Sequence, residues 1–328
     1  MENNRPKISF VMAGRNDDYG GNFLNRMRTS IRTLLFLAEK YDTNFELVIV
    51  DYNPPADKLL LKEALALDSN SNLNIRHIII PHEFHLEVSQ GGKNPFPEYI
   101  AKNIGIRRAN GTFIASVNPD IIFSDVFVKY LASGDLDANY FYRANRHDLD
   151  IKAIDDLLTV PEILQICRKT TVRIWTNNGS PYVSWKRWFK RFKRKPKPYN
   201  LWHAPVFNFI PAIKSYLNPD RIHDAAAGDF IIMHRDAWFK TRGFDQIPFL
   251  SYVDGYHLFR ISCFGLKQEI IPFPIYHVDH RTSNGTRPSL DIQNYLADTK
   301  KMQDTGIPYK EYSPDWGFPK NNFAEKLF

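Results

Sequence analysis

Four apolar runs in the first 120 residues alternate with stretches of helical spacing. The runs are ISFVMAG (8–14), FELVIVDY (45–52), IRHIIIP (75–81) and TFIASVN (112–118). The segments between them, in which apolar residues recur at helical intervals, are 22–41, 56–67 and 98–110. Strands that are apolar almost throughout are buried on both faces, as in a parallel sheet covered by helices on each side. The alternation therefore predicts an α/β fold with a Rossmann-like, mostly parallel sheet flanked by helices.

The same pattern predicts where a ligand binds, because ligands of open α/β sheets lie at the carboxyl ends of the strands. Asp51 lies at the end of the second run, and Asn118, Pro119 and Asp120 end the fourth. A carboxylate in this place is a candidate ligand for a hard divalent cation such as Mg²⁺ or Mn²⁺. The alternative is an ordinary turn in which Asp120 caps the following helix.

The second half of the chain is less regular. We expect helices near 124–133, 150–168 and 256–265, strands at 228–235 and 268–278, and an irregular, polar tail from 281 to 328. The chain shows no internal repeat and no clear linker, which favours one compact domain of three parts. These are a nucleotide-binding half (1–121), a more variable half (122–280) and a C-terminal extension (281–328).

Composition limits the cellular compartment and the classes of partner that we expect. Cys167 and Cys263 are far apart and are the only cysteines, so a disulfide framework is not expected and the context is reducing. No run approaches the length of a membrane span, and the first residues lack a signal-peptide layout, so we expect a cytoplasmic protein. Of the net charge of +7, the segment 185–198 supplies eight Lys/Arg and no acid, which leaves −1 for the rest. A charge confined to one segment argues against a general nucleic-acid binder.

That basic segment, WKRWFKRFKRKPKP, also has a regular apolar pattern. Trp185, Trp188, Phe189 and Phe192 recur at helical spacing and form one face, with basic residues around it. Such a helix is typical of an interfacial anchor on an anionic membrane. The alternatives are that the aromatic residues pack on the domain, or that the segment binds a polyanion.

Three later residues have chemistry of their own. Asp254 stands just ahead of an expected helix, where it is either an N-cap or a general base. His277 and His280 lie near a strand end, beside Asp279. Histidine is the commonest metal ligand, but a pair like this is more often part of the surface or the core.

In their order and spacing these segments resemble the family-2 glycosyltransferases with a GT-A fold. The resemblance covers roughly residues 7 to 280 and implies that 1–121 bind the nucleotide sugar, whereas 122–280 bind the acceptor and carry the catalytic residue. It rests on ISFVMAGRND, FELVIVDYN, AKNIGIRRANGTFIASVNPD, GDFIIMHRDAWFKTRGFD, SYVDGYHLFRISCFGLK and IYHVDH. Each motif is weak alone, and their order together is the signal.

The resemblance implies a role for each matching residue. Asp120 matches the last carboxylate of the family's Asp-x-Asp motif, and Asn118 replaces the first. Asp254 matches the catalytic base, whereas Val253 replaces the usual Glu before it, which puts an acceptor contact in doubt. His277 is the first choice for completing the metal site and His280 the second. The implied nucleotide-sugar-binding residues are Gly14, Arg15, Asn16, Asp51, Lys102, Asn118 and Asp229.

The implied activity is metal-dependent, inverting transfer of a hexosyl or deoxyhexosyl group from a nucleotide sugar to an acceptor hydroxyl. Mn²⁺ or Mg²⁺ is the expected cofactor, and a glycan or lipid-linked glycan the expected acceptor. The setting would be surface polysaccharide or glycoconjugate synthesis, in the cytoplasm or at the inner face of a membrane, without nucleic acid. The alternatives are a catalytically degenerate transferase that binds a glycan or a partner, a nucleotidylyltransferase, and a basic polyanion-binding protein.

Overall fold

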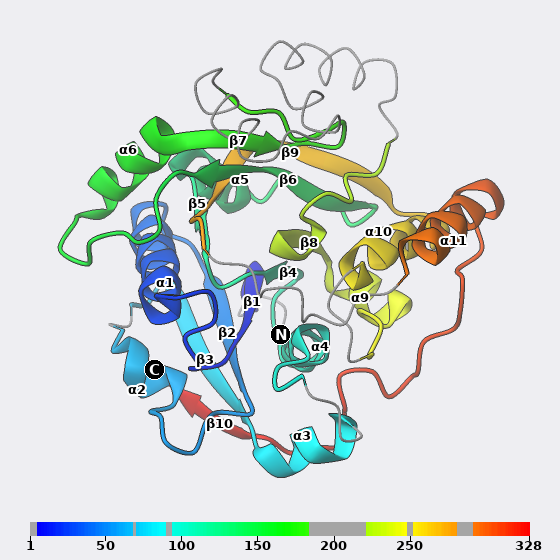
Figure 1. Cartoon of the computed structure of the whole chain (residues 1–328), viewed down its shortest axis with the longest axis horizontal. Coiled ribbons are helices and arrows are strands. Elements are labelled where there is room, and N and C mark those ends of the chain that lie inside the picture. The colour runs from blue at the N-terminus through cyan, green and yellow to red at the C-terminus, as the bar shows by residue number, and fades with distance from the viewer. Residues whose placement is uncertain (1–4, 68–69, 90–93, 184–220, 248–251, 281–290) are drawn as a thin grey trace.

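One mixed β-sheet runs through the protein, and helices cover both of its faces (Figure 1). The computed structural model describes residues 5–67, 70–89, 94–183, 221–247, 252–280 and 291–328. Within these residues the strand order is β10-β3-β2-β1-β4-β8-β6-β9-β5, and β7 pairs with β6. The strands are β1 (Ile8–Gly14), β2 (Phe45–Tyr52), β3 (Leu73–Ile80), β4 (Phe113–Val117), β5 (Ile121–Phe123), β6 (Tyr140–Leu149), β7 (Thr171–Trp175), β8 (Phe230–His234), β9 (Lys267–His277) and β10 (Ala324–Leu327).

The four strands predicted from the apolar runs form the parallel block β3-β2-β1-β4. Beyond β4 the sheet changes character: β8 pairs antiparallel with β4 and with β6, while β6 and β9 are parallel. The expected α/β sheet flanked by helices in one compact domain is confirmed. Its antiparallel strands join the block at both edges, since β10 also runs antiparallel to β3.

Double-sided burial explains the unbroken apolar runs. In β1, Ile8, Phe10 and Met12 face one core, and Val11 and Ala13 face the other. The first core is covered by α1 (Phe23–Lys40), α2 (Leu61–Leu65), α5 (Asp125–Ser133) and α6 (Val160–Thr170). The second is covered by α3 (His82–Ser89), α4 (Glu98–Arg108), α9 (Arg235–Thr241), α10 (Val253–Cys263) and α11 (Ile292–Thr305).

Two helices begin later than the spacing predicts. α2 contains only residues 61–65 of the expected 56–67, and α6 starts at Val160 rather than near 150. The start of α6 has a local cause: Thr159 and Glu162 form a reciprocal capping box, with a proline in the first turn. The Thr-x-x-Glu pattern is visible in the sequence and marks this boundary better than the apolar spacing does.

The described part of the tail, residues 291–328, is not irregular, so that expectation is wrong there. Residues 292–305 form α11, which packs on α10 with Tyr295 and Met302 buried. Residues 324–327 form β10 at the edge of β3, and Trp316 between them is 2% exposed. The polar composition of the tail hid these elements, because a peripheral helix and an edge strand each bury few residues.

The membrane expectation concerns residues that the structure does not describe. The basic aromatic segment 185–198 lies within 184–220, outside the described residues. Among the helices that are described, none is both long and apolar enough to cross a bilayer.

Candidate functional site

The Asn-Pro-Asp turn connects β4 to β5 and carries Asp120 to the end of the parallel block. The turn is closed by a hydrogen bond from the Ile121 amide to the Asn118 carbonyl at 3.3 Å. Strand β5 then pairs antiparallel with β9, and Ile121 lies opposite His277. This pairing brings the carboxylate of Asp120 beside the late histidines, although they are far apart in the sequence.

Asp120, His277 and His280 form the group of side chains best suited to a metal ion among the described residues. Their candidate ligand atoms all lie within 4.8 Å of one another. His280 Nε2 is 3.2 Å and His277 Nε2 3.7 Å from Oδ2 of Asp120. Burial opposes ionisation of Asp120, but the two histidines and Arg26 hold the pKa of this carboxyl well below its usual range.

The chemistry of these donors fits a divalent cation. One carboxylate oxygen and two imidazole nitrogens suit a first-row transition ion, whereas Mg²⁺ prefers a shell of oxygens. Arg26, which is 1% exposed, places Nε 3.6 Å from Asp120 Oδ2. This guanidinium offsets part of the buried charge of Asp120, so the histidines are not the only groups that stabilise the carboxylate.

A second set of charged residues lies behind the histidines, and the sequence did not single it out. Asp148 Oδ1 is 3.4 Å from His277 Nδ1 and 2.9 Å from Arg146 Nε. Arg146 also binds Asp229, with Nη1 2.7 Å from Oδ2. Asp148 and Arg146 belong to β6, whose polar end had no motif to mark it; only its parallel pairing with β9 reveals its place beside His277.

Lys102 connects the Asn-Pro-Asp turn to the loop before β8. Its side chain is fully buried in α4. The ammonium donates to Asn118 Oδ1 at 2.6 Å and to the Gly228 carbonyl at 2.8 Å, and pairs with Glu98 at 2.8 Å. Asn118 in turn donates to Asp229 at 2.8 Å. These partners are all protein groups, and the expected contact of Lys102 with phosphates stays a prediction.

Asp254 lies in the first turn of α10 and contacts the same loop. Its Oδ2 accepts from the Gly228 amide at 2.5 Å. Burial and the negative charge of Glu98 raise the pKa of Asp254 to about 6. A carboxyl with this pKa is the most suitable proton acceptor near the site. Val253, in the place of the family's Glu, is fully buried in the second core and offers no polar contact.

Asp51 lies at the carboxyl end of β2, as predicted. It is fully buried. Its Oδ2 accepts from the Leu61 amide at 2.7 Å, which fastens the start of α2, and lies 3.3 Å from His77 Nε2. A contact between Asp51 and a nucleotide therefore stays a prediction.

The residues after β1 line the same strand ends. Arg15 donates through Nε to the Asn53 carbonyl at 2.7 Å, and Asn16 to the Leu59 carbonyl at 2.9 Å. Gly14 ends β1 where a Cβ would lie 2.9 Å from the Phe23 ring, so packing requires a glycine. These positions are compatible with the predicted role of the three residues in lining a nucleotide pocket, which stays a prediction.

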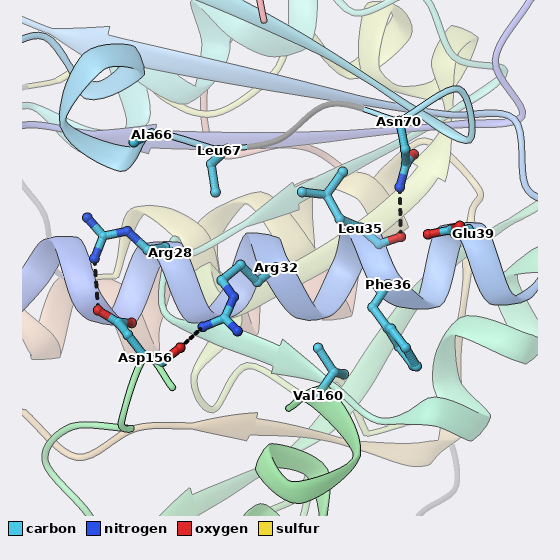
Figure 2. A pocket seen from close by; sticks show the side chains of 10 residues that line it. All are labelled: Arg28, Arg32, Leu35, Phe36, Glu39, Ala66, Leu67, Asn70, Asp156 and Val160. Atoms are coloured by element: carbon cyan, nitrogen blue, oxygen red, sulfur yellow. Dashed lines mark hydrogen bonds and ion pairs between the residues drawn. The ribbon is translucent and has the colours of Figure 1, made fainter. Parts of the chain in front are cut away.

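A cavity of about 490 Å³ lies elsewhere, along α1 (Figure 2). Arg28 and Arg32 project into it from the helix, opposite Leu67 and Val160. Arg28 pairs with Asp156 at 3.0 Å and Arg32 donates to the Asp156 carbonyl at 2.7 Å. None of the site residues described above lines this cavity, so it is separate from the Asp120 cluster.

Comparisons with known proteins find a distant structural likeness. No protein-family profile and no curated protein matches the sequence. Among solved structures, S. aureus TarS 1–349 in complex with UDP-GlcNAc superposes with a TM-score of 0.49 and 11% identity, covering 95% of this chain and 69% of that one. A second structure, of S. aureus TarS 1–349, superposes with a TM-score of 0.45 and 11% identity, covering 95% of this chain and 68% of that one. A further S. aureus TarS structure superposes with a TM-score of 0.43 and 12% identity, covering 83% of this chain and 37% of that one. At these values the likeness by itself assigns neither a family nor an activity to the chain.

Proposed function

We propose that this protein is an inverting glycosyltransferase that moves a sugar from a nucleotide-sugar donor to an acceptor hydroxyl. One observation carries the proposal. The buried ammonium of Lys102 contacts both Asn118, in the turn of Asp120, and Gly228, whose amide holds Asp254. A group suited to a cation and a carboxyl suited to accept a proton are thus held on either side of one lysine, as displacement at a diphosphate-linked carbon requires.

The proton acceptor is Asp254. With a pKa of about 6, its carboxyl is mostly ionised at pH 7 to 8 and is still basic enough to take a proton from a hydroxyl in the transition state. The Gly228 amide fixes one oxygen and so orients the carboxylate. Protonation of Asp254 should make kcat fall below about pH 6.

The donor diphosphate belongs at the Asp120 cluster. Asp120, His277 and His280 would hold a divalent cation, and the two imidazoles favour Mn²⁺ over Mg²⁺. When bound, the cation supplies positive charge that offsets the charge of the departing diphosphate. Arg26 and Lys102 add fixed positive charge around the same turn, and burial makes their electrostatic effect stronger than it would be in water.

The acceptor and its setting follow from the resemblance and the sequence rather than from the site. We propose a glycan or lipid-linked glycan acceptor, hexosyl or deoxyhexosyl transfer, and a role in surface polysaccharide synthesis. The basic aromatic segment 185–198 would bring the enzyme to an anionic membrane surface. Flotation with anionic liposomes tests this: binding should be lost when the four aromatic residues of the segment are replaced by serine.

Binding and turnover test the central proposal. Thermal shifts are measured with UDP, GDP, dTDP, CMP and their common sugars, each with and without Mn²⁺. One class of nucleotide should stabilise the protein only when Mn²⁺ is present. At a ligand concentration of 100 times Kd, the free energy of unfolding should rise by about 2.7 kcal/mol. Asp120→Ala should abolish the Mn²⁺ dependence. Asp156→Ala, which breaks an ion pair at the separate cavity, should retain it.

The products separate the alternatives. A glycosyltransferase releases nucleoside diphosphate from its donor, whereas a nucleotidylyltransferase releases pyrophosphate from a nucleoside triphosphate. Asp254→Asn should bind the donor and lose transfer. If the wild type binds a nucleotide sugar but neither transfers nor hydrolyses it, the degenerate transferase is the correct alternative; Asn118 and Val253 are the departures that favour it.

A further inference from the structure

We propose that Asp148 is a positioning residue, which orients the His277 ring so that Nε2 points at Asp120 and is available to a divalent cation. The inference rests on the cation site of the proposed function and goes beyond it, because Asp148 belongs to no motif in the sequence. The inference concerns residues of β6, β7 and β9. The contribution of each residue to metal binding can be measured without an assay of transferase activity.

The sheet itself places the two residues together. β6 and β9 run parallel, and Asp148 is the register partner of His277. The ring of His277 lies between two carboxylates: Nδ1 is 3.4 Å from Asp148 Oδ1, and Nε2 is 3.7 Å from Asp120 Oδ2. A proton on Nδ1, attracted by the carboxylate of Asp148, leaves the lone pair on Nε2 directed at the cluster.

Asp148 is itself held in place, so it can impose an orientation. Its Oδ2 accepts from Trp175 Nε1 at 2.7 Å, and its Oδ1 pairs with Arg146 Nε at 2.9 Å. The pairing of β6 with β7 sets Arg146 opposite Trp175, and the guanidinium lies 4.9 Å from the indole centroid. Both carboxylate oxygens of Asp148 therefore have partners other than His277.

This arrangement argues that Asp148 acts through His277 rather than as a ligand. Asp120, His277 and His280 bring ligand atoms to one point, and Asp148 is not among them. To reach a cation there, Asp148 would have to leave both Trp175 and Arg146. A carboxylate that bonds the far nitrogen of a ligating histidine is the usual outer partner of a metal site, and its loss typically weakens metal affinity about 10- to 100-fold.

Calorimetric titration of Mn²⁺ into the metal-free, full-length protein tests the inference. Asp148→Asn should raise the Kd for Mn²⁺ by about 10- to 100-fold. Asp120→Asn should abolish binding. Trp175→Phe keeps the ring and removes one bond to Asp148, so it should give a smaller loss of the same kind. Asp156→Asn makes the same substitution in an arginine-paired aspartate at the separate cavity and should leave the Kd unchanged.

Nitrogen-15 NMR of the histidine rings adds a readout that a merely structural role would not change. In the metal-free wild type, neutral His277 should carry its proton on Nδ1, and Asp148→Asn or Trp175→Phe should shift this tautomer balance. An unchanged Kd and tautomer in Asp148→Asn would overturn the inference. A loss as complete as that of Asp120→Asn would make Asp148 a ligand instead. If the wild type binds no Mn²⁺ yet binds a nucleotide sugar, the cation site and this inference fail while transferase function remains open.

Discussion

Buried Asp120 and half-buried Asp254 have pKa values shifted in opposite directions because their neighbours differ. Asp120 faces Arg26 and two histidines, which keep it ionised, and Asp254 faces a backbone amide and the charge of Glu98. Opposite pKa shifts of paired carboxyls are the arrangement by which one group holds charge and the other moves a proton. At the residue scale, these contacts produce the opposite pKa shifts on which the proposed roles of the two residues depend.

The raised pKa of Asp254 has a cost in stability that depends on pH. The folded-state value of about 6 exceeds the ordinary 3.8, so between these values the folded protein binds more protons than the unfolded chain. The contribution of Asp254 to the free energy of unfolding therefore falls as the pH rises from about 4 to about 6. Asp254→Asn removes this loss, and its gain over the wild type should grow with pH to at most about 3 kcal/mol.

Thermal melting at pH values from 4 to 8 checks this expectation. The difference in Tm between Asp254→Asn and the wild type should increase through pH 5 to 6 and then level off. Asp156→Asn, whose aspartate has an exposed side chain, should show no such rise. A difference for Asp254→Asn that is constant over the whole range would contradict the burial of an ionisable Asp254.

At the scale of elements, close contact between α4 and the parallel block places Lys102 under the strand ends. Gly105 makes this contact possible: a Cβ there would lie 2.5 Å from Val11 Cγ1 and 2.8 Å from Val50 Cγ2. In an exposed helix, alanine is favoured over glycine by about 1 kcal/mol. Here the overlap with two buried valines outweighs that preference, because overpacking a dense core costs about 1–3 kcal/mol.

Gly105→Ala should accordingly destabilise the protein by about 1–2 kcal/mol in chemical denaturation. Combining it with Val11→Ala, which removes the nearest methyl groups, should cost less than the sum of the two single changes, since the new methyl fills the space of the old ones. Additive costs would show that α4 moves as a whole instead of meeting a rigid sheet.

At the scale of the whole molecule, the tail completes the sheet at the edge formed by β3. Strand β10 covers the edge of β3, and Glu325 binds Arg76 through two contacts, at 2.5 and 3.0 Å. Between α11 and β10 the chain crosses α4, where Arg107 and Arg108 donate to backbone carbonyls of Trp316 and Gly317 at 2.9 and 2.7 Å. Because α11 packs on α10 in the second half, the tail contacts both halves of the chain.

Deleting residues 324–328 should lower the free energy of unfolding by about 1–3 kcal/mol, because strand hydrogen bonds and a partly buried ion pair are lost. The bared edge of β3 should also promote concentration-dependent self-association. Melting and size-exclusion chromatography measure the two effects. Glu325→Gln, which keeps the strand, should cost less than about 1 kcal/mol and elute as the wild type does. An unchanged Tm after the deletion would mean that β10 contributes nothing to stability.

The local sequence pattern predicted the parallel block and placed Asp51 and Asp120 at its strand ends. It could do so because a strand buried on both faces is an unbroken apolar run in the sequence. It also marked Asp254, His277 and His280 as candidates. The pattern did not indicate Asp148, Arg146 or Trp175, and it did not predict the helix and strand of the tail. Those depended on which distant strands pair and in what register: β5 with β9 brings Asp120 to His277, and β6 with β9 brings Asp148 behind it. Strand pairing is decided by the packing of the whole sheet, so only the tertiary structure could assemble the site.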